Sequence, residues 1–98
     1  MYRIIEGRGT GKTSRLMLLA KENDAILVCG DPHSMRYKAK AYGIEGLKFI
    51  SYWDFITHDG DYEEDGTYII DELECLMNSA FFPYSKKAKL IGYSISLE

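Results

Sequence analysis

The chain has 98 residues, enough for one domain spanning 1–98, and its 46% hydrophobic and 28% charged residues exclude a disordered or fibrous protein. Its formal net charge of -3 offers no general attraction to polyanions, so the charge does not support a nucleic-acid partner. Apolar runs such as 25–29 are far shorter than the ~20 residues of a membrane-spanning helix, and the N-terminus has no signal pattern. We therefore expect a cytoplasmic protein without membrane contact.

Its two cysteines, Cys29 and Cys75, are expected to be buried free thiols.

Five apolar segments, residues 2–6, 25–29, 47–51, 67–70 and 89–96, are typical of short strands. Helical patterns lie between them: one begins at residue 13 and ends in the polar residues 21–24, and the others cover about 32–41, 52–56 and 72–80. The acidic residues 58–66 predict an exposed loop. Strands separated by helices predict an α/β fold, namely a three-layer sandwich with a mostly parallel five-stranded sheet.

The segment that carries most chemical information is Glu6-Gly7-Arg8-Gly9-Thr10-Gly11-Lys12-Thr13, placed after the first predicted strand and before a helix. Glycines there let the backbone turn tightly enough for amide hydrogens and the helix N-terminus to point at phosphate. Lys12 would neutralise the β- and γ-phosphates, and the Thr13 hydroxyl would ligate Mg²⁺. The segment therefore predicts a nucleoside triphosphate site formed by Gly7, Arg8, Gly9, Thr10, Gly11, Lys12 and Thr13.

A second motif, Tyr68-Ile69-Ile70-Asp71-Glu72, places two acids directly after a predicted strand. Asp71 would support the Mg²⁺ ion, and Glu72 would orient and deprotonate the attacking water. An Asp-Glu pair alone is also common at helix N-termini, where acids interact favourably with the helix dipole. Its position downstream of a phosphate loop favours the catalytic interpretation.

These two motifs match Walker A and Walker B, and the chain resembles the P-loop NTPases, in particular a minimal form of the ATPase core of phage large terminases and helicases. The resemblance implies ATP as substrate or ligand and Mg²⁺ as cofactor. It also implies that Arg8, by its place in a terminase-like loop, acts on the γ-phosphate as a third catalytic residue beside Lys12 and Glu72. One position departs from the family pattern, because Glu6 stands where Walker A has its first glycine. A carboxylate at that place puts the strength of nucleotide binding in doubt.

A calcium loop is a competing interpretation of the acidic segment. Asp61, Glu63, Asp65, Gly66 and Glu72 nearly match the spacing of an EF-hand loop. That loop needs a helix before Asp61 and the start of a helix near residue 69, whereas the sequence has a turn and then a strand pattern there. The flanking residues therefore disfavour it.

The expected function is Mg²⁺-dependent ATP binding with hydrolysis by a minimal P-loop ATPase. Because complete helicases and terminases carry further domains, the resemblance implies an assembly: a homo-oligomer, a protein partner or, against the net charge, nucleic acid. The alternative is a nucleotide-responsive regulatory module that hydrolyses little or nothing. Glu6 and the absence of an identifiable arginine finger motivate that alternative.

Overall fold

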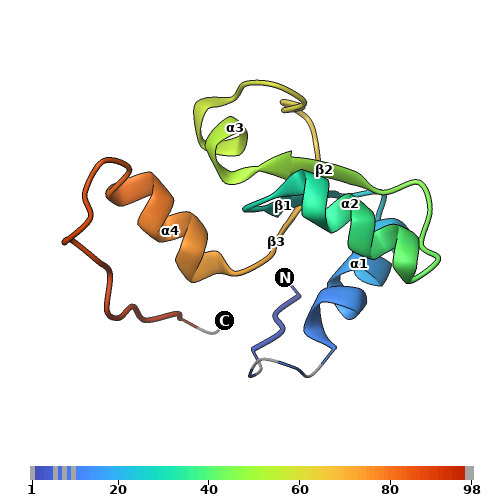
Figure 1. Cartoon of the computed structure of the whole chain (residues 1–98), viewed down its shortest axis with the longest axis horizontal. Coiled ribbons are helices and arrows are strands. Elements are labelled where there is room, and N and C mark those ends of the chain that lie inside the picture. Colours follow the sequence, from blue (N-terminus) through green and yellow to red (C-terminus); the bar gives the residue numbers. More distant parts are fainter. Residues whose placement is uncertain (1, 6, 8, 10, 97–98) are drawn as a thin grey trace.

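A computed structural model describes residues 2–5, 7, 9 and 11–96 of the chain. Within this part the elements follow one another as α1 (Lys12–Glu22), β1 (Ile26–Cys29), α2 (Pro32–Ala41), β2 (Lys48–Ser51), α3 (Tyr52–Thr57), β3 (Tyr68–Ile70) and α4 (Leu73–Phe81) (Figure 1). Among these described residues, none of the helices has both the length and the apolar character needed to cross a membrane.

Local sequence signals explain where the helices begin and end. The Asp31 side chain accepts a hydrogen bond from the Ser34 N–H at 3.3 Å and caps α2, whose first residue is Pro32. Ser51 caps α3 in the same way, by accepting from the Asp54 N–H at 3.1 Å. These caps satisfy backbone donors that have no partner inside the helix.

The three strands form one parallel sheet in the order β2-β1-β3. In the register, Ile26 of β1 lies beside Lys48 of β2 and beside Tyr68 of β3. All four residues of β1 are buried, as expected for a central strand covered on both faces. Because the strands are parallel, their carboxyl ends meet at one edge of the sheet.

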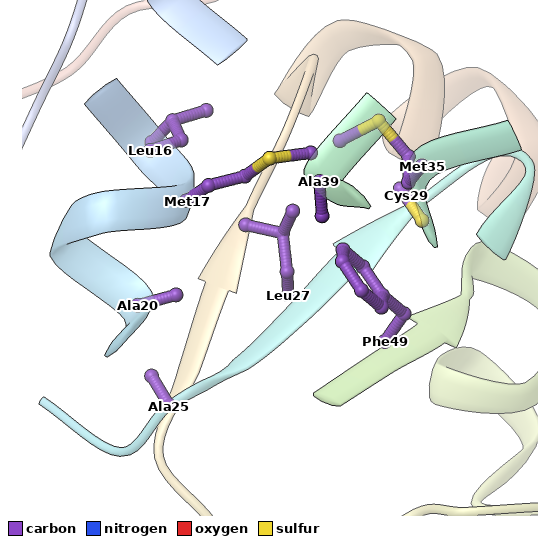
Figure 2. Packing of buried hydrophobic residues seen from close by; sticks show 9 residues of the cluster. All are labelled: Leu16, Met17, Ala20, Ala25, Leu27, Cys29, Met35, Ala39 and Phe49. Carbon is purple, nitrogen blue, oxygen red and sulfur yellow. The ribbon is translucent and has the colours of Figure 1, made fainter. Parts of the chain in front are cut away.

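Helices α1 and α2 cover one face of the sheet. Met17, which is fully buried, extends from α1 toward Leu27 of β1 and Ala39 of α2 in Figure 2. Phe49 from β2 and Cys29 from β1 belong to the same cluster. A buried side chain of this size contributes about 1.5–3 kcal/mol by leaving water, so this cluster fixes α1 on the sheet.

Helices α3 and α4 pack on the opposite face. Ile26, Val28 and Ile50 are buried there, and Phe55 of α3 and Leu76 of α4 pack against them. Successive residues of β1 thus point to opposite faces, as strand geometry requires. The described elements form three layers, two helices on each side of the sheet.

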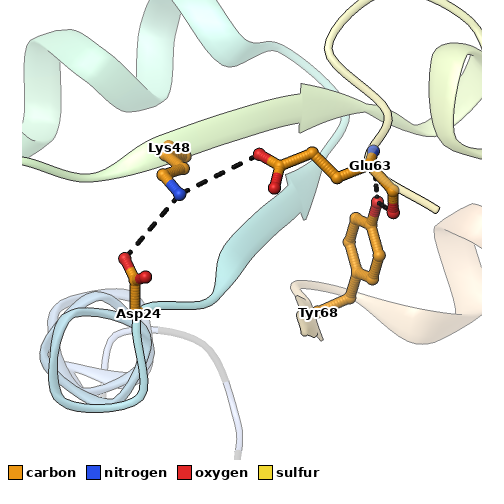
Figure 3. A network of polar contacts seen from close by, with 4 residues as sticks. All are labelled: Asp24, Lys48, Glu63 and Tyr68. Atoms are coloured by element: carbon orange, nitrogen blue, oxygen red, sulfur yellow. Dashed lines mark hydrogen bonds and ion pairs between the residues drawn. The ribbon is translucent and has the colours of Figure 1, made fainter. Parts of the chain in front are cut away.

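The acidic loop between α3 and β3 is attached near the amino ends of the strands. Figure 3 shows Lys48 Nζ between Asp24 Oδ1 at 3.7 Å and Glu63 Oε2 at 3.9 Å, while the Tyr68 hydroxyl accepts from the Glu63 N–H at 2.8 Å. The ion pairs are largely solvent-exposed, so each contributes little stability. The strand at Tyr68 follows this loop directly, which confirms that the segment is not an EF-hand with a second helix starting near residue 69.

The prediction of five strands is wrong, because the sheet has three. Residues 2–5 and 89–96 have no regular secondary structure and form no ladder in the described structure. Residue Ile4 packs against the cluster of Figure 2 without backbone pairing, and the Leu90 N–H donates to Asn78 Oδ1 of α4 at 2.9 Å instead of to a strand. Gly92 also weakens the last segment as a strand. An apolar pattern predicts extended backbone but does not provide a ladder partner.

Candidate functional site

The predicted acid pair Asp71 and Glu72 lies at the carboxyl edge of the parallel sheet. Gly30 follows β1, Tyr52 follows β2 and Asp71 follows β3. Ligands of open parallel sheets bind outside the carboxyl ends of the strands, because the loops there converge and helix N-termini point toward them.

The glycine-rich loop leads into α1 through left-handed backbone. Gly9 has φ +77° and Gly11, the residue before α1, has φ +79°, conformations that side chains disfavour. Lys12 and Thr13 are consequently the first two residues of α1, and the Ser14 hydroxyl donates to the Gly11 carbonyl oxygen at 3.0 Å. The first amides of α1 have no partner within the helix, and the first turn holds no acidic residue. This helix end is suited to an anion.

Lys12 and Glu72 form an ion pair, with Nζ 3.3 Å from Oε1. The two residues are 60 positions apart in the sequence and come from the two predicted motifs. The Lys12 side chain is 17% exposed and that of Glu72 is 36% exposed, so solvent screens the pair only in part. The fold thus joins the end of the glycine-rich loop to the acid pair.

Asp71 is the buried charged residue of the described chain, at 9% exposure. Burial, followed by the negative charge of Glu72, raises the pKa of its carboxyl group above the ordinary value, although Lys12 and Lys38 act in the opposite direction. Among the described residues, its Oδ1 atom has no hydrogen-bond partner. A buried carboxylate oxygen in this condition costs free energy unless a ligand, ion or water satisfies it.

Tyr52 holds the backbone of the acid pair. Its hydroxyl donates to the Asp71 carbonyl oxygen at 2.6 Å and also lies 3.3 Å from the Glu72 carbonyl oxygen. Burial raises the pKa of Tyr52, so the hydroxyl keeps its proton for donation. Glu72 itself has φ +57° and ψ +68°, a left-handed conformation that costs a non-glycine residue on the order of 1 kcal/mol. Strained backbone of this kind concentrates at functional sites.

The predicted residues are only partly described by the structure. Lys12, Asp71 and Glu72 come together, and Thr13 lies in the first turn of α1 beside Lys12. Gly7, Gly9 and Gly11 lead into that turn. Arg8 and Thr10, together with Glu6, lie outside the described residues, so their predicted roles stay predictions.

Two residues near the acid pair carry no sequence motif. The positive charge of Lys38 in α2 lowers the pKa of Asp71, and Tyr52 binds the backbone of the acid pair from the start of α3. Neither has a spacing that relates it to the motifs, because only the packing of α2 and α3 on the sheet relates them to the acid pair. A sequence search for polar residues directly after strands would have found Tyr52.

The expectation for the cysteines holds for one of them. Cys29 is buried, and burial followed by the charge of Asp71 raises the pKa of its thiol to about 11. Cys75 is exposed, which corrects the prediction, because it lies on the first turn of α4 where no layer covers it. The Cys75 Sγ atom and one carboxylate oxygen from each of Glu72 and Glu74 lie within 4.8 Å of one another.

Comparisons of the chain with protein-family models, curated proteins and solved structures found no match.

Proposed function

We propose that this chain binds a nucleoside triphosphate, with ATP as the reference ligand, together with Mg²⁺ at the carboxyl edge of the sheet, and hydrolyses it. The observation that carries the proposal is the Lys12–Glu72 ion pair of 3.3 Å. It supports a single site because one partner ends the glycine-rich loop and the other belongs to the acid pair. Two motifs that matched by chance would have no reason to meet in space.

The charges of the site fit an anion that carries a cation. The amides of the first turn of α1 and the ammonium group of Lys12 are donors for phosphate oxygens. The orphaned Oδ1 atom of buried Asp71 is the kind of chemical group that a divalent cation satisfies. Thr13 and Asp71 would hold Mg²⁺, which neutralises phosphate charge when it is bound.

Phosphate binding and activation of Glu72 are linked through Lys12. The structure pairs the ammonium group of Lys12 with the Glu72 carboxylate. A triphosphate offers several negative charges to the same ammonium group, so it competes with Glu72 for Lys12. Release of Glu72 leaves a carboxylate beside the terminal phosphate that orients a water molecule and accepts its proton.

The same ion pair motivates the second candidate, a regulatory module that binds nucleotide and hydrolyses little. If Lys12 keeps part of its contact with Glu72 in the bound state, the carboxylate is unavailable as a base. Glu6 in place of a glycine favours this alternative as well, since a carboxylate beside the loop opposes anion binding.

Glu72→Gln tests the proposal and separates it from the alternative. The amide cannot accept a proton, so phosphate release should fall by roughly 10²- to 10⁴-fold in a single-turnover assay. Loss of the ion pair frees Lys12, so the affinity for ATP should rise by up to about fivefold, which corresponds to an exposed pair of ~0.2–1 kcal/mol.

Glu74→Gln is the matched control, because Glu74 is exposed on the first turn of α4. It should change neither the rate nor the affinity. Phosphate release by Glu72→Gln at the wild-type rate would contradict the assignment of Glu72. Wild-type protein that binds ATP and retains it intact would establish the regulatory module instead.

A further inference from the structure

A cavity of about 580 Å³ opens between the beginning of α3 and the end of α4. Four aromatic side chains line it, Tyr52, Trp53, Phe82 and Tyr84. This volume falls within the ~300–1,000 Å³ typical of small-molecule sites, which combine apolar walls with a few polar groups. The cavity is therefore large enough for an organic ligand.

The cavity lies at the same edge of the sheet as the acid pair. Gly30 and Ser51, which stand at the carboxyl ends of β1 and β2, line it. Lys12, Asp71 and Glu72 do not line it, but Tyr52 does, and the Tyr52 hydroxyl binds the Asp71 carbonyl oxygen at 2.6 Å. One side chain thus forms a wall of the cavity and supports the backbone of the acid pair.

The distance from the Lys12–Glu72 ion pair to the cavity suits a single nucleotide. Asn78, which lines the cavity, lies on α4 six residues after Glu72, the residue that precedes the helix. At ~1.5 Å per helical residue this corresponds to about 9 Å, which is shorter than an extended ribose triphosphate. A ligand with its phosphates at Lys12 can therefore place a ring in the cavity.

The lining has the chemistry that recognises a planar heteroaromatic ring. Trp53 is 51% exposed and Tyr84 is 90% exposed, so both rings present faces that the protein leaves largely in water. Bases stack on such faces regardless of sequence. The Asn78 Oδ1 atom accepts from the Leu90 N–H at 2.9 Å, which leaves its Nδ2 amide as a donor for a ring nitrogen or carbonyl oxygen.

We propose that this cavity binds the purine base of the nucleotide whose phosphates lie at Lys12, with the base stacked against Trp53 and Tyr84. The inference rests on the proposed function, since it assigns the other end of the same ligand. A purine is favoured over a pyrimidine because its two fused rings offer the larger stacking surface to the aromatic walls.

Tyr84→Ala is the principal test, with Tyr37→Ala as the matched control. Both tyrosines are largely exposed, at 90% and 75%, so neither substitution should affect folding, and Tyr37 lies on α2 away from the cavity. Tyr84→Ala should weaken ATP binding by roughly five- to hundredfold, the effect of removing one stacking partner. It should leave the affinity for inorganic tripolyphosphate unchanged, and Tyr37→Ala should alter neither affinity.

Adenosine alone provides a second readout that is independent of the phosphate site. Trp53 is the single tryptophan of the chain, so its fluorescence should respond to adenosine and less to cytidine. Equal ATP affinity of wild type and Tyr84→Ala, with tripolyphosphate still competing for ATP, would overturn the base site and keep the phosphate site. A fluorescence response to adenosine without any tripolyphosphate binding would refute the phosphate site and leave the base cavity supported.

Discussion

At the scale of single residues, the site holds more unfavourable features than folding alone explains. Asp71 is a buried carboxylate with an orphaned oxygen, and Glu72 beside it adopts a left-handed conformation. Both features cost stability. Natural proteins retain such costs where a bound ligand offsets them.

Replacement of Asp71 by asparagine should therefore stabilise the ligand-free protein while impairing the site. The amide has the shape of the carboxylate without its buried charge, so we expect a gain on the order of 1 kcal/mol, or a rise in Tm of about 4–8 °C. Mg²⁺-dependent ATP affinity should fall at least about tenfold, because Mg²⁺ loses an anionic ligand. Asp65→Asn, an exposed control in the acidic loop, should change neither quantity.

The stability gained by Asp71→Asn should increase as the pH rises. The pKa of Asp71 is raised in the folded state, so folding takes up protons and the charged carboxylate destabilises the native state. The advantage of the asparagine variant should be absent below about pH 3, where the unfolded carboxyl is also protonated, and should grow from about pH 4 as the pH rises through the native pKa. Thermal unfolding between pH 3 and 8 measures the difference in Tm between Asp71→Asn and wild type. A difference that is largest at pH 3 would contradict the raised pKa of Asp71.

At the scale of elements, α1 connects the core to the site. Its first residue is Lys12, and its buried side chains Leu16, Met17 and Ala20 fix it against the sheet as Figure 2 shows. The position of Lys12 opposite Glu72 therefore depends on packing one to two turns further along the helix.

Met17→Ala should destabilise the protein by about 2–5 kcal/mol, because it removes a fully buried side chain and leaves a cavity. Leu18→Ala is the control on the same helix, since Leu18 is 50% exposed, and its effect should stay within about 0.5 kcal/mol. Urea denaturation measures both free energies of unfolding. Equal effects of the two substitutions would show that α1 does not pack as described.

The helices were easier to predict from the sequence than the strands. Helix α2 spans Pro32–Ala41, the range predicted from its proline and the following glycine, because capping signals are local. The strands at residues 2–6 and 89–96 were predicted from equally good apolar patterns and do not form in the described structure. A strand needs a backbone partner elsewhere in the chain, and the Leu90 N–H bonds to Asn78 instead.

At the scale of the whole molecule, a three-stranded sheet between two helical layers brings separate motifs to one edge. The radius of gyration, 13.9 Å, exceeds the ~13 Å of a compact chain of 100 residues, and Figure 1 shows the irregular segment after α4 running outside the layers. Sequence motifs predicted Lys12, Asp71 and Glu72, but not Tyr52, Lys38 or the aromatic cavity. Those depend on how α2, α3 and α4 pack, which no local spacing encodes.

Lys12, at the start of α1, organises the proposed site for a triphosphate with Mg²⁺. The most direct measurement is calorimetric titration of the intact chain with ATP in the presence of Mg²⁺, for wild type, Lys12→Ala and Lys21→Ala. Lys21 is a lysine in the last turn of the same helix, so it controls for loss of positive charge. We expect binding by wild type and Lys21→Ala and none by Lys12→Ala, whereas wild-type affinity in Lys12→Ala, or no binding by wild type, would contradict the proposed site.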